Sequence, residues 1–237
     1  MGKGQQRLVD ILDFARRELG KCVRDFTLRR WLNKWGYRWK RMRKSLKHER
    51  NEDAFEHAKR HLEALHEQET EQRLDVFYFD EMGVNLTPSV PYGWQIKGQR
   101  ILLPTKRSEN QTVLGFVNKQ LENQFFLFKG AANSKVVVEC FNQFVDTLTK
   151  KTVVLLDNAT PHTSKLFQSH QEVWKEKGLY LFFIPPYSPE LNLLERLWKE
   201  IKYSWLKPQF IIDEIELENQ LVDVLKNIGT KFTISFV

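Results

Sequence analysis

Alternating apolar and polar runs after residue 75 predict a mixed α/β domain. Short apolar runs that are typical of strands occupy 76–79, 112–117, 124–128, 152–156 and 179–184. Helical spacing of apolar residues covers 134–148, 164–177 and 188–206. We expect Ser188 to be the N-cap of the last helix, with Pro189 in its first turn. This order predicts an antiparallel start followed by βαβ crossovers, and therefore a mixed sheet with helices on both faces.

The first 50 residues follow a different pattern, with two helices that each end at a glycine. Residues 6–19 have helical spacing and stop at Gly20, and a second helix opens at Phe26 or Thr27 and ends at Gly36. Its predicted buried stripe is Leu28, Trp31, Leu32 and Trp35. A basic extended segment, 37–47, follows. The outline is that of a helix-turn-helix module with a wing, although a helical hairpin with a charged surface fits the same pattern.

Charge is concentrated in this first segment. The whole chain carries a formal net charge of +7, while residues 1–50 hold 16 Lys or Arg against 5 Asp or Glu. A basic N-terminal segment followed by a mildly acidic remainder of the chain favours binding of a nucleic acid over a basic surface that is merely solvated. The candidate DNA contacts are Arg29, Arg30, Lys34, Arg38, Lys40, Arg41, Arg43 and Lys44.

Composition excludes several other classes. Hydrophobic residues make up 41% of the chain and charged residues 28%, which is ordinary for a globular protein with a real core. No apolar run reaches the roughly 18 residues of a membrane span, and no secretion signal opens the chain. Cys22 and Cys140 lie far apart, which suggests neither a disulfide framework nor a zinc site. We therefore expect a cytoplasmic, nucleoid-associated protein without a membrane partner.

Residues 51–73 are charged and helix-prone, with a narrow apolar stripe of Phe55, Ala58, Leu62 and Leu65. This pattern predicts a helix that connects the basic segment to the α/β domain. Three histidines lie on it at positions 57, 61 and 66, and the first two have the spacing of a metal-binding pair. Without a third ligand in view, we interpret them as surface residues rather than as a metal site.

Three carboxylates occupy positions where acids are not expected. Asp80 ends the first predicted strand, and strand alternation places it on the face opposite Glu81. Asp157 ends the most hydrophobic strand. Glu195 lies about 40° from Leu191 at the edge of the apolar stripe of the last helix, which separates it from Glu190 and Glu200. These positions along the strands and the helix predict that the three carboxylates lie close together on one face of the sheet.

Such a cluster has a chemical meaning. An unpaired buried carboxylate costs several kcal/mol, and three that converge repel one another unless cations lie between them. Two Mg²⁺ ions some 4 Å apart could activate a nucleophile and stabilise a leaving oxygen in phosphoryl transfer. Each acid also has a plainer interpretation. Asp80 could cap a turn, Asp157 with Asn158 could form an Asx turn, and Glu195 could pair with Arg196 or Lys199.

Three neighbours are auxiliary candidates. Asn158 directly follows the second acid. His162 lies five residues after Asp157 and could orient a water or a phosphate, or simply close a turn. Lys202 lies two turns beyond Glu195 on the same helix face, where a cation would meet DNA backbone or form a salt bridge.

Three segments around these acids together resemble one family. Residues 77–84, 155–162 and 184–202 resemble the three catalytic blocks of the mariner-like superfamily of DDE transposases, most closely its bacterial insertion-sequence branch. The third block, with its Tyr-Ser-Pro-acid and Asn, Glu and Trp at fixed spacing, is the most specific. There are 37 residues between the second and third acids, which falls within the spread of that branch.

The resemblance implies a ribonuclease H-like core, to which the order of predicted elements also conforms. It implies two Mg²⁺ or Mn²⁺ ions at Asp80, Asp157 and Glu195. It further implies cleavage at the terminal inverted repeats of an insertion sequence and transfer of the 3′ ends to target DNA, typically containing TA. The synaptic complex would hold a homodimer. The implied domains are a DNA-binding module (1–50), a linker helix (51–74), the catalytic domain (75–210) and a helical tail (211–237).

Departures from the family keep other functions open. The family usually carries two DNA-binding modules before the core, whereas about 70 residues precede it here. The chain is therefore expected to be a fragment, a truncated copy or one frame of a split gene. The alternatives to an active transposase are a DNA-binding repressor or decayed copy, and a structure-selective nuclease that cuts without joining ends.

Overall fold

The computed structural model describes residues 8–20, 22–39, 46–87, 89, 96–97, 100–103 and 105–236. The chain forms two compact units, Met1–Ser45 and Leu46–Val237. Among the described residues, no helix is both long enough and apolar enough to cross a membrane.

Unit 1 contains two helices, α1 (Leu8–Leu19) and α2 (Asp25–Lys34). The predicted stops are confirmed, because Gly20 and Gly36 follow the helices with φ of +62° and +85°, a backbone region that glycine enters without steric cost. The predicted wing is not seen at residues 37–39, which form no strand. The rest of that basic segment, 40–45, lies outside the described residues.

The predicted buried stripe of α2 is only partly right. Leu28 is buried, but Trp31 and Trp35 are 38% and 64% exposed. Within the described residues of unit 1, α1 adds one buried side chain, Leu12. Two short helices offer too little apolar surface to cover two tryptophans, so helical spacing alone overestimated the core.

Unit 2 is built on a five-stranded sheet in the order β3-β2-β1-β4-β5. The strands are β1 (Asp75–Val84), β2 (Gln111–Val117), β3 (Asn123–Lys129), β4 (Thr152–Leu156) and β5 (Leu179–Phe183). β1–β2 and β2–β3 are antiparallel, whereas β1–β4 and β4–β5 are parallel. The predicted mixed sheet with an antiparallel start is confirmed.

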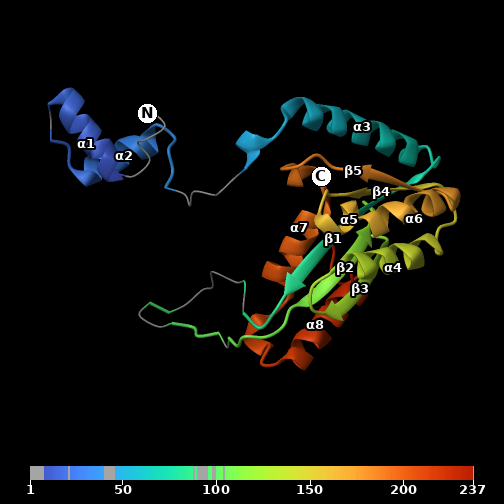
Figure 1. The fold of residues 1–237 in the computed structure, drawn as a ribbon. Helices are drawn as coiled ribbons and strands as arrows, with labels where there is room; N and C mark the ends of the chain where they lie inside the picture. Colours follow the sequence, from blue (N-terminus) through green and yellow to red (C-terminus); the bar gives the residue numbers. More distant parts are fainter. Residues whose placement is uncertain are drawn as a thin grey trace. The chain divides into compact units, whose positions relative to one another are not determined.

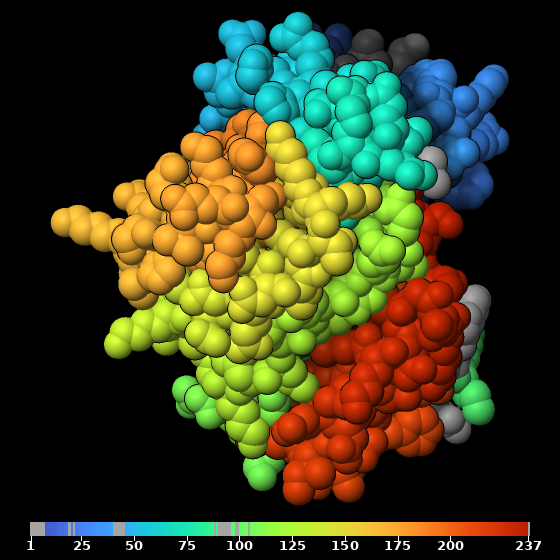
Figure 2. Space-filling view, turned by 90° about the vertical axis from the view of Figure 1, so that its right-hand side faces the viewer, coloured from blue at the N-terminus to red at the C-terminus, as the bar shows by residue number. Residues whose placement is uncertain are grey.

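Helices cover both faces of this sheet (Figure 1). One face packs against α3 (Glu52–Thr70), α7 (Leu194–Glu200) and α8 (Glu214–Lys226). The other face packs against α4 (Ser134–Val145), α5 (Thr160–Thr163) and α6 (Lys165–Glu176). Figure 2 shows α8 (red) lying alongside the yellow-green part of the chain around β3 and α4, and Lys129 in β3 pairs with Glu214 in α8 at 3.1 Å.

The predicted continuous helix over 188–206 is wrong. The segment divides into a 3₁₀ turn η2 (Pro189–Leu191), helix α7, and a π-helical turn η3 (Ile201–Trp205). Asn192 breaks it, because this residue is extended and its Oδ1 accepts a hydrogen bond from Leu194 N at 3.1 Å. The side chain of Ser188 donates to Pro186 O instead of capping a helix. The remaining short turns are η1 (Lys47–Glu49) and η4 (Pro208–Phe210).

The linker helix predicted over residues 51–73 is α3, with Asn51 as its N-cap. Two of its histidines support packing. The ring of His61 stacks on Phe182 with centroids 4.8 Å apart. His66 hydrogen-bonds Glu69 and the hydroxyl of Tyr78, both at 2.8 Å. α3 is therefore held on the sheet by polar as well as apolar contacts.

Candidate active site

Asp80 lies in the middle of β1 rather than at its end. The strand continues to Val84 because residues 78–84 pair with β2, and this pairing places Asp80 directly opposite Gly115. The predicted face is correct, since Val76 and Tyr78 belong to the same core cluster as α7. The sequence prediction ended the strand too early because two consecutive acids interrupt its apolar pattern.

The carboxylate of Asp80 is held by two donors. Trp198 of α7 donates its indole N–H to Oδ2 at 3.1 Å, and the backbone N–H of Glu81 donates to Oδ1 at 2.8 Å. The tryptophan reaches this position because residue 115 is glycine: a Cβ there would lie 2.9 Å from Trp198 Cη2. Burial raises the pKa of Asp80 to about 7, and the charges of Asp157 and Glu195 add to that rise.

Asp157 directly follows β4 and is held by the turn after it. Its Oδ1 accepts from Ala159 N at 3.0 Å and lies 2.8 Å from Nδ1 of His162. His162 is only 5% exposed, and its ring contacts Phe79. Its hydrogen bond is the main reason that the pKa of Asp157 lies below its ordinary value. The Asx turn considered from the sequence is therefore present, and a buried histidine reinforces it.

Glu195 lies in the first turn of α7 with its side chain exposed. It lines a cavity of about 390 Å³ together with Asp80 and Asp157. The structure thus brings all three predicted acids to one cavity. Only Asp80 among them is substantially buried, because the side chain of Asp157 is 57% exposed. Within the described residues, no three His, Cys, Asp or Glu side chains are gathered closely enough to hold a metal ion as they stand.

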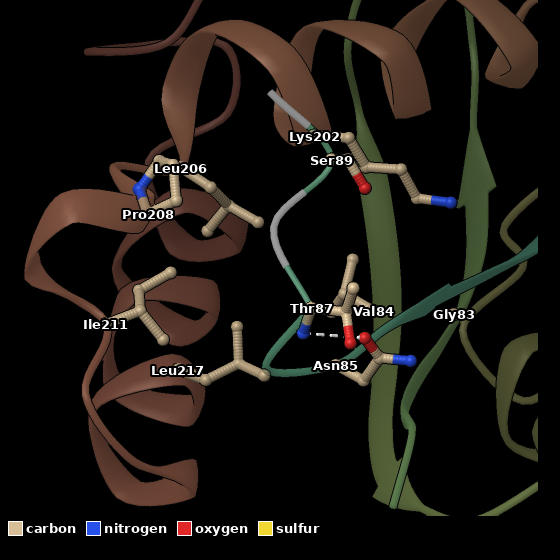
Figure 3. A pocket seen from close by; sticks show the side chains of 10 residues that line it. All are labelled: Gly83, Val84, Asn85, Thr87, Ser89, Lys202, Leu206, Pro208, Ile211 and Leu217. Carbon is tan, nitrogen blue, oxygen red and sulfur yellow. Dashed lines mark hydrogen bonds between the residues drawn. The ribbon is translucent and has the colours of Figure 1, made fainter. Parts of the chain in front are cut away.

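The auxiliary candidates take different places. Asn158 lines the same cavity and donates its amide to Ile184 O at 2.7 Å, which ties the end of β4 to the end of β5. Lys202 extends from η3 across the sheet and lines a neighbouring cavity of about 120 Å³ (Figure 3). Burial lowers the pKa of its ammonium, while the charges of Asp80 and Glu195 oppose that effect. Lys202 is therefore a partly buried cation beside the acidic cluster.

The opposite wall of the main cavity is the loop 184–192, which we call the wall loop. Tyr187 in this loop has φ of +60° and is 41% exposed. A non-glycine residue in this region costs about 1–3 kcal/mol, so its surroundings must hold it there. Glu190, in the same loop, accepts hydrogen bonds from Lys47 and Arg50. Both residues belong to the Tyr-Ser-Pro-acid motif of the third block, but neither the strained backbone nor a contact across about 140 positions leaves a periodic signal in the sequence.

The predicted DNA contacts of unit 1 lie on its surface. Arg29, Arg30, Lys34 and Arg38 are all exposed. The other four candidates, Lys40, Arg41, Arg43 and Lys44, lie outside the described residues.

The fold and these acids define the class. The chain belongs to the DDE endonuclease superfamily, whose family model matches residues 75–218. It is also similar to an insertion element IS630 uncharacterized 39 kDa protein of Shigella sonnei, with 29% identity over 183 residues. That match covers 74% of this chain and 50% of the relative, so the chain spans about half the length of the curated protein that it matches. The predicted mariner-like and insertion-sequence resemblance is confirmed.

Solved structures of the Mos1 transposase share the fold. The Mos1 strand transfer complex gives a TM-score of 0.60 at 15% identity, covering 95% of this chain and 72% of that chain. The Mos1 mariner paired end complex with Mn gives the same TM-score and identity, with 95% and 73% coverage. The predicted ribonuclease H-like mixed sheet is therefore confirmed.

Proposed function

We propose that this chain is the catalytic part of a DDE transposase, which cleaves DNA at the ends of an insertion sequence and transfers the 3′ ends to target DNA. The observation that carries the proposal is the convergence of Asp80, Asp157 and Glu195 on one cavity. These acids come from β1, the end of β4 and α7, elements that the family match includes.

The residues of the cavity fit divalent metal ions. All three acids offer oxygen ligands, which Mg²⁺ and Mn²⁺ prefer. The raised pKa of Asp80 reflects a buried site that holds more negative charge than it can solvate, and a cation relieves that cost. We propose two Mg²⁺ or Mn²⁺ ions here, which would supply nucleophile activation and charge neutralisation for phosphoryl transfer.

The chain's own residues orient this site. Trp198 and the Glu81 amide fix both oxygens of Asp80, so that its carboxylate does not rotate freely. His162 fixes Asp157, and being buried it holds that orientation firmly. Lys202, already partly desolvated, would bind a backbone phosphate beside the acids.

The proposed partners are double-stranded DNA at the terminal inverted repeats and at the target site. Exposed cations on α2 would contact phosphates of the repeats, with Arg29, Arg30 and Lys34 as the described contributors. Two copies of the chain would act together as a homodimer, each cutting one end. The domain division 1–50, 51–74, 75–210 and 211–237 belongs to this proposal.

The test is a cleavage assay on labelled DNA that carries the flanking inverted repeats, with Mg²⁺ or Mn²⁺ and the full chain. We expect nicked and strand-transfer products from the unmodified protein and none from Asp157→Asn. The matched control is Asp146→Asn, which alters an exposed aspartate that pairs with Lys177. This variant should cut the DNA normally. Unaltered cleavage by Asp157→Asn would refute the site. If the protein binds the DNA without cutting it, it is a repressor. If it cuts the DNA without joining the ends to a target, it is a nuclease.

A further inference from the structure

Two cations from the start of unit 2 converge on one acid of the wall loop. Lys47 donates to Glu190 Oε1 at 2.7 Å, and Arg50 donates to the same oxygen through Nη1. We call residues 46–51 the lead-in segment, because there the chain enters unit 2 and continues into α3. Glu190 therefore joins two segments that are about 140 positions apart in the sequence.

Arg50 is the rigid part of this junction. Its side chain is only 11% exposed, and its guanidinium lies 3.8 Å from the centre of the Phe55 ring. Glu52 accepts two further hydrogen bonds from it, at 3.1 and 2.8 Å. Arg50 is thus fixed on α3, and its hydrogen bond to Glu190 connects the lead-in segment to the wall loop.

Glu190 lies next to the residues that face the acids. Tyr187, Ser188 and Pro189 all line the main cavity, and Tyr187 has a left-handed backbone conformation, which costs free energy to hold. The loop is tied at its start by the bond from Asn158 to Ile184 O. The ion pairs of Glu190 provide a second tie at its far side, so that the loop is fixed at both ends of its strained part.

We propose that Glu190 is a positioning residue that couples the lead-in segment to the cavity wall. Displacement of the lead-in segment would then shift Tyr187 relative to the acids. This inference rests on the proposed function, because it assumes that the cavity is the cleavage site. The coupling makes cleavage depend on the position of Lys47 and Arg50.

Global stability should depend little on this junction, because Lys47 is 56% exposed and Arg50 keeps its two hydrogen bonds to Glu52 when Glu190 loses its charge. Glu190→Gln removes the charge and keeps the shape. The matched control is Glu214→Gln, which breaks another ion pair between distant segments, that of Lys129 and Glu214. We expect both variants to fold, with melting temperatures within about 3 °C of the unmodified protein.

Hydrogen exchange of the full chain gives the direct test. In Glu190→Gln, amide exchange should rise about tenfold in the wall loop, at Leu191 and Asn192, whose amides donate to Ser188 O and Pro189 O, and in the lead-in segment. The reciprocal variant Arg50→Gln should accelerate the same wall-loop amides, although the substitution lies far away in sequence. Glu214→Gln should change neither segment. Exchange that rises in neither segment, or only in the segment carrying the substitution, overturns the coupling.

Cleavage kinetics give the second readout. Under single-turnover conditions with saturating inverted-repeat DNA, Glu190→Gln should cut about tenfold more slowly, while its Kd for that DNA changes less than twofold. Glu190→Asp should recover part of the rate. An unchanged rate, or a loss explained entirely by Kd, overturns the positioning role. If the unmodified protein does not cut at all, the proposed function fails, and the exchange experiment still decides whether the two segments are coupled.

Discussion

Replacing Asp80 with Asn should stabilise the metal-free protein, and increasingly so as the pH rises. The pKa of Asp80 is about 7 in the folded protein, against 3.8 for an ordinary aspartate. Well below pH 3.8 the carboxyl is protonated in both states and contributes nothing to the pH dependence. Between pH 4 and 7 the unfolded chain ionises at this residue while the folded chain resists, so stability is lost. Asparagine cannot ionise and escapes this loss.

The magnitude follows from the two pKa values. A rise from 3.8 to about 7 corresponds to a ceiling of about 4 kcal/mol, at about 1.4 kcal/mol for each pH unit. Solvent at the cavity mouth screens part of this, so we expect about 2 kcal/mol. The amide of Asn also disturbs the bond from Trp198, at a cost of about 1 kcal/mol that does not vary with pH. The change of the stability difference with pH therefore reports the ionisation of Asp80 separately from the lost hydrogen bond.

The assay is urea unfolding in the presence of a chelator at intervals from pH 4 to pH 8.5. The free energy of unfolding of Asp80→Asn minus that of the unmodified protein should rise through this range and level off above about pH 7. Asp157→Asn provides a control of opposite sign, because the pKa of Asp157 is lowered in the folded protein. Its ionisation stabilises the fold, so the variant should lose stability relative to the unmodified protein as the pH rises through the acidic range.

A flat difference between Asp80→Asn and the unmodified protein would refute the reasoning. It would mean that Asp80 is solvated well enough to ionise normally, and the electrostatic argument for a cation in the cavity would lose its main support. Added Mn²⁺ should reduce the advantage of the variant, because metal binding favours the ionised carboxylate.

Three other substitutions test the supports of the site. Gly115→Ala forces Phe125 and Trp198 aside and should cost about 1–3 kcal/mol in urea unfolding, and a loss below about 0.5 kcal/mol would contradict the close approach. His162→Ala should weaken Mn²⁺ binding about 10–100-fold, as measured by calorimetry. His162→Asn should retain more of the Mn²⁺ affinity, because its side-chain amide can replace Nδ1 as the donor to Asp157. Equal Mn²⁺ affinities of the two variants would argue that His162 does not orient Asp157. Lys202→Met should reduce the salt dependence of DNA binding by about one unit of log–log slope, and an unchanged slope would exclude a phosphate contact.

The strands of unit 2 could be predicted because their apolar runs stand out in the sequence without any knowledge of the tertiary structure. β4 is wholly buried, and its five residues are all apolar or β-branched. The exceptions share a cause. β1 extends past Asp80 and Glu81 only because β2 pairs with it, and the helix breaks at Asn192 through a side-chain bond. Both outcomes depend on a partner that periodicity does not encode.

The three acids could be predicted from strand and helix periodicity, whereas the residues that hold them in place could not. Strand alternation placed Asp80 on the side of α7, and helical phase selected Glu195 as the acid of the cavity. The helical spacing of Trp198 relative to Leu191 and Leu194 indicates only packing, and nothing local indicates that its indole reaches a carboxylate across Gly115. Such contacts become visible only when strand register and helix packing are known together.

The π-helical turn η3 places a length requirement on the chain. Leu206 N bonds Ile201 O, five residues back, so this turn holds one residue more than an α-turn. Deleting one residue between positions 201 and 205 would restore an α-turn and rotate the downstream chain by about 100°. Trp205 would then leave Phe232, whose ring centre lies 5.3 Å away, and α8 would lose its alignment with the sheet. Single-residue insertions and deletions should therefore be far more harmful here than amino-acid substitutions at exposed positions such as Tyr203.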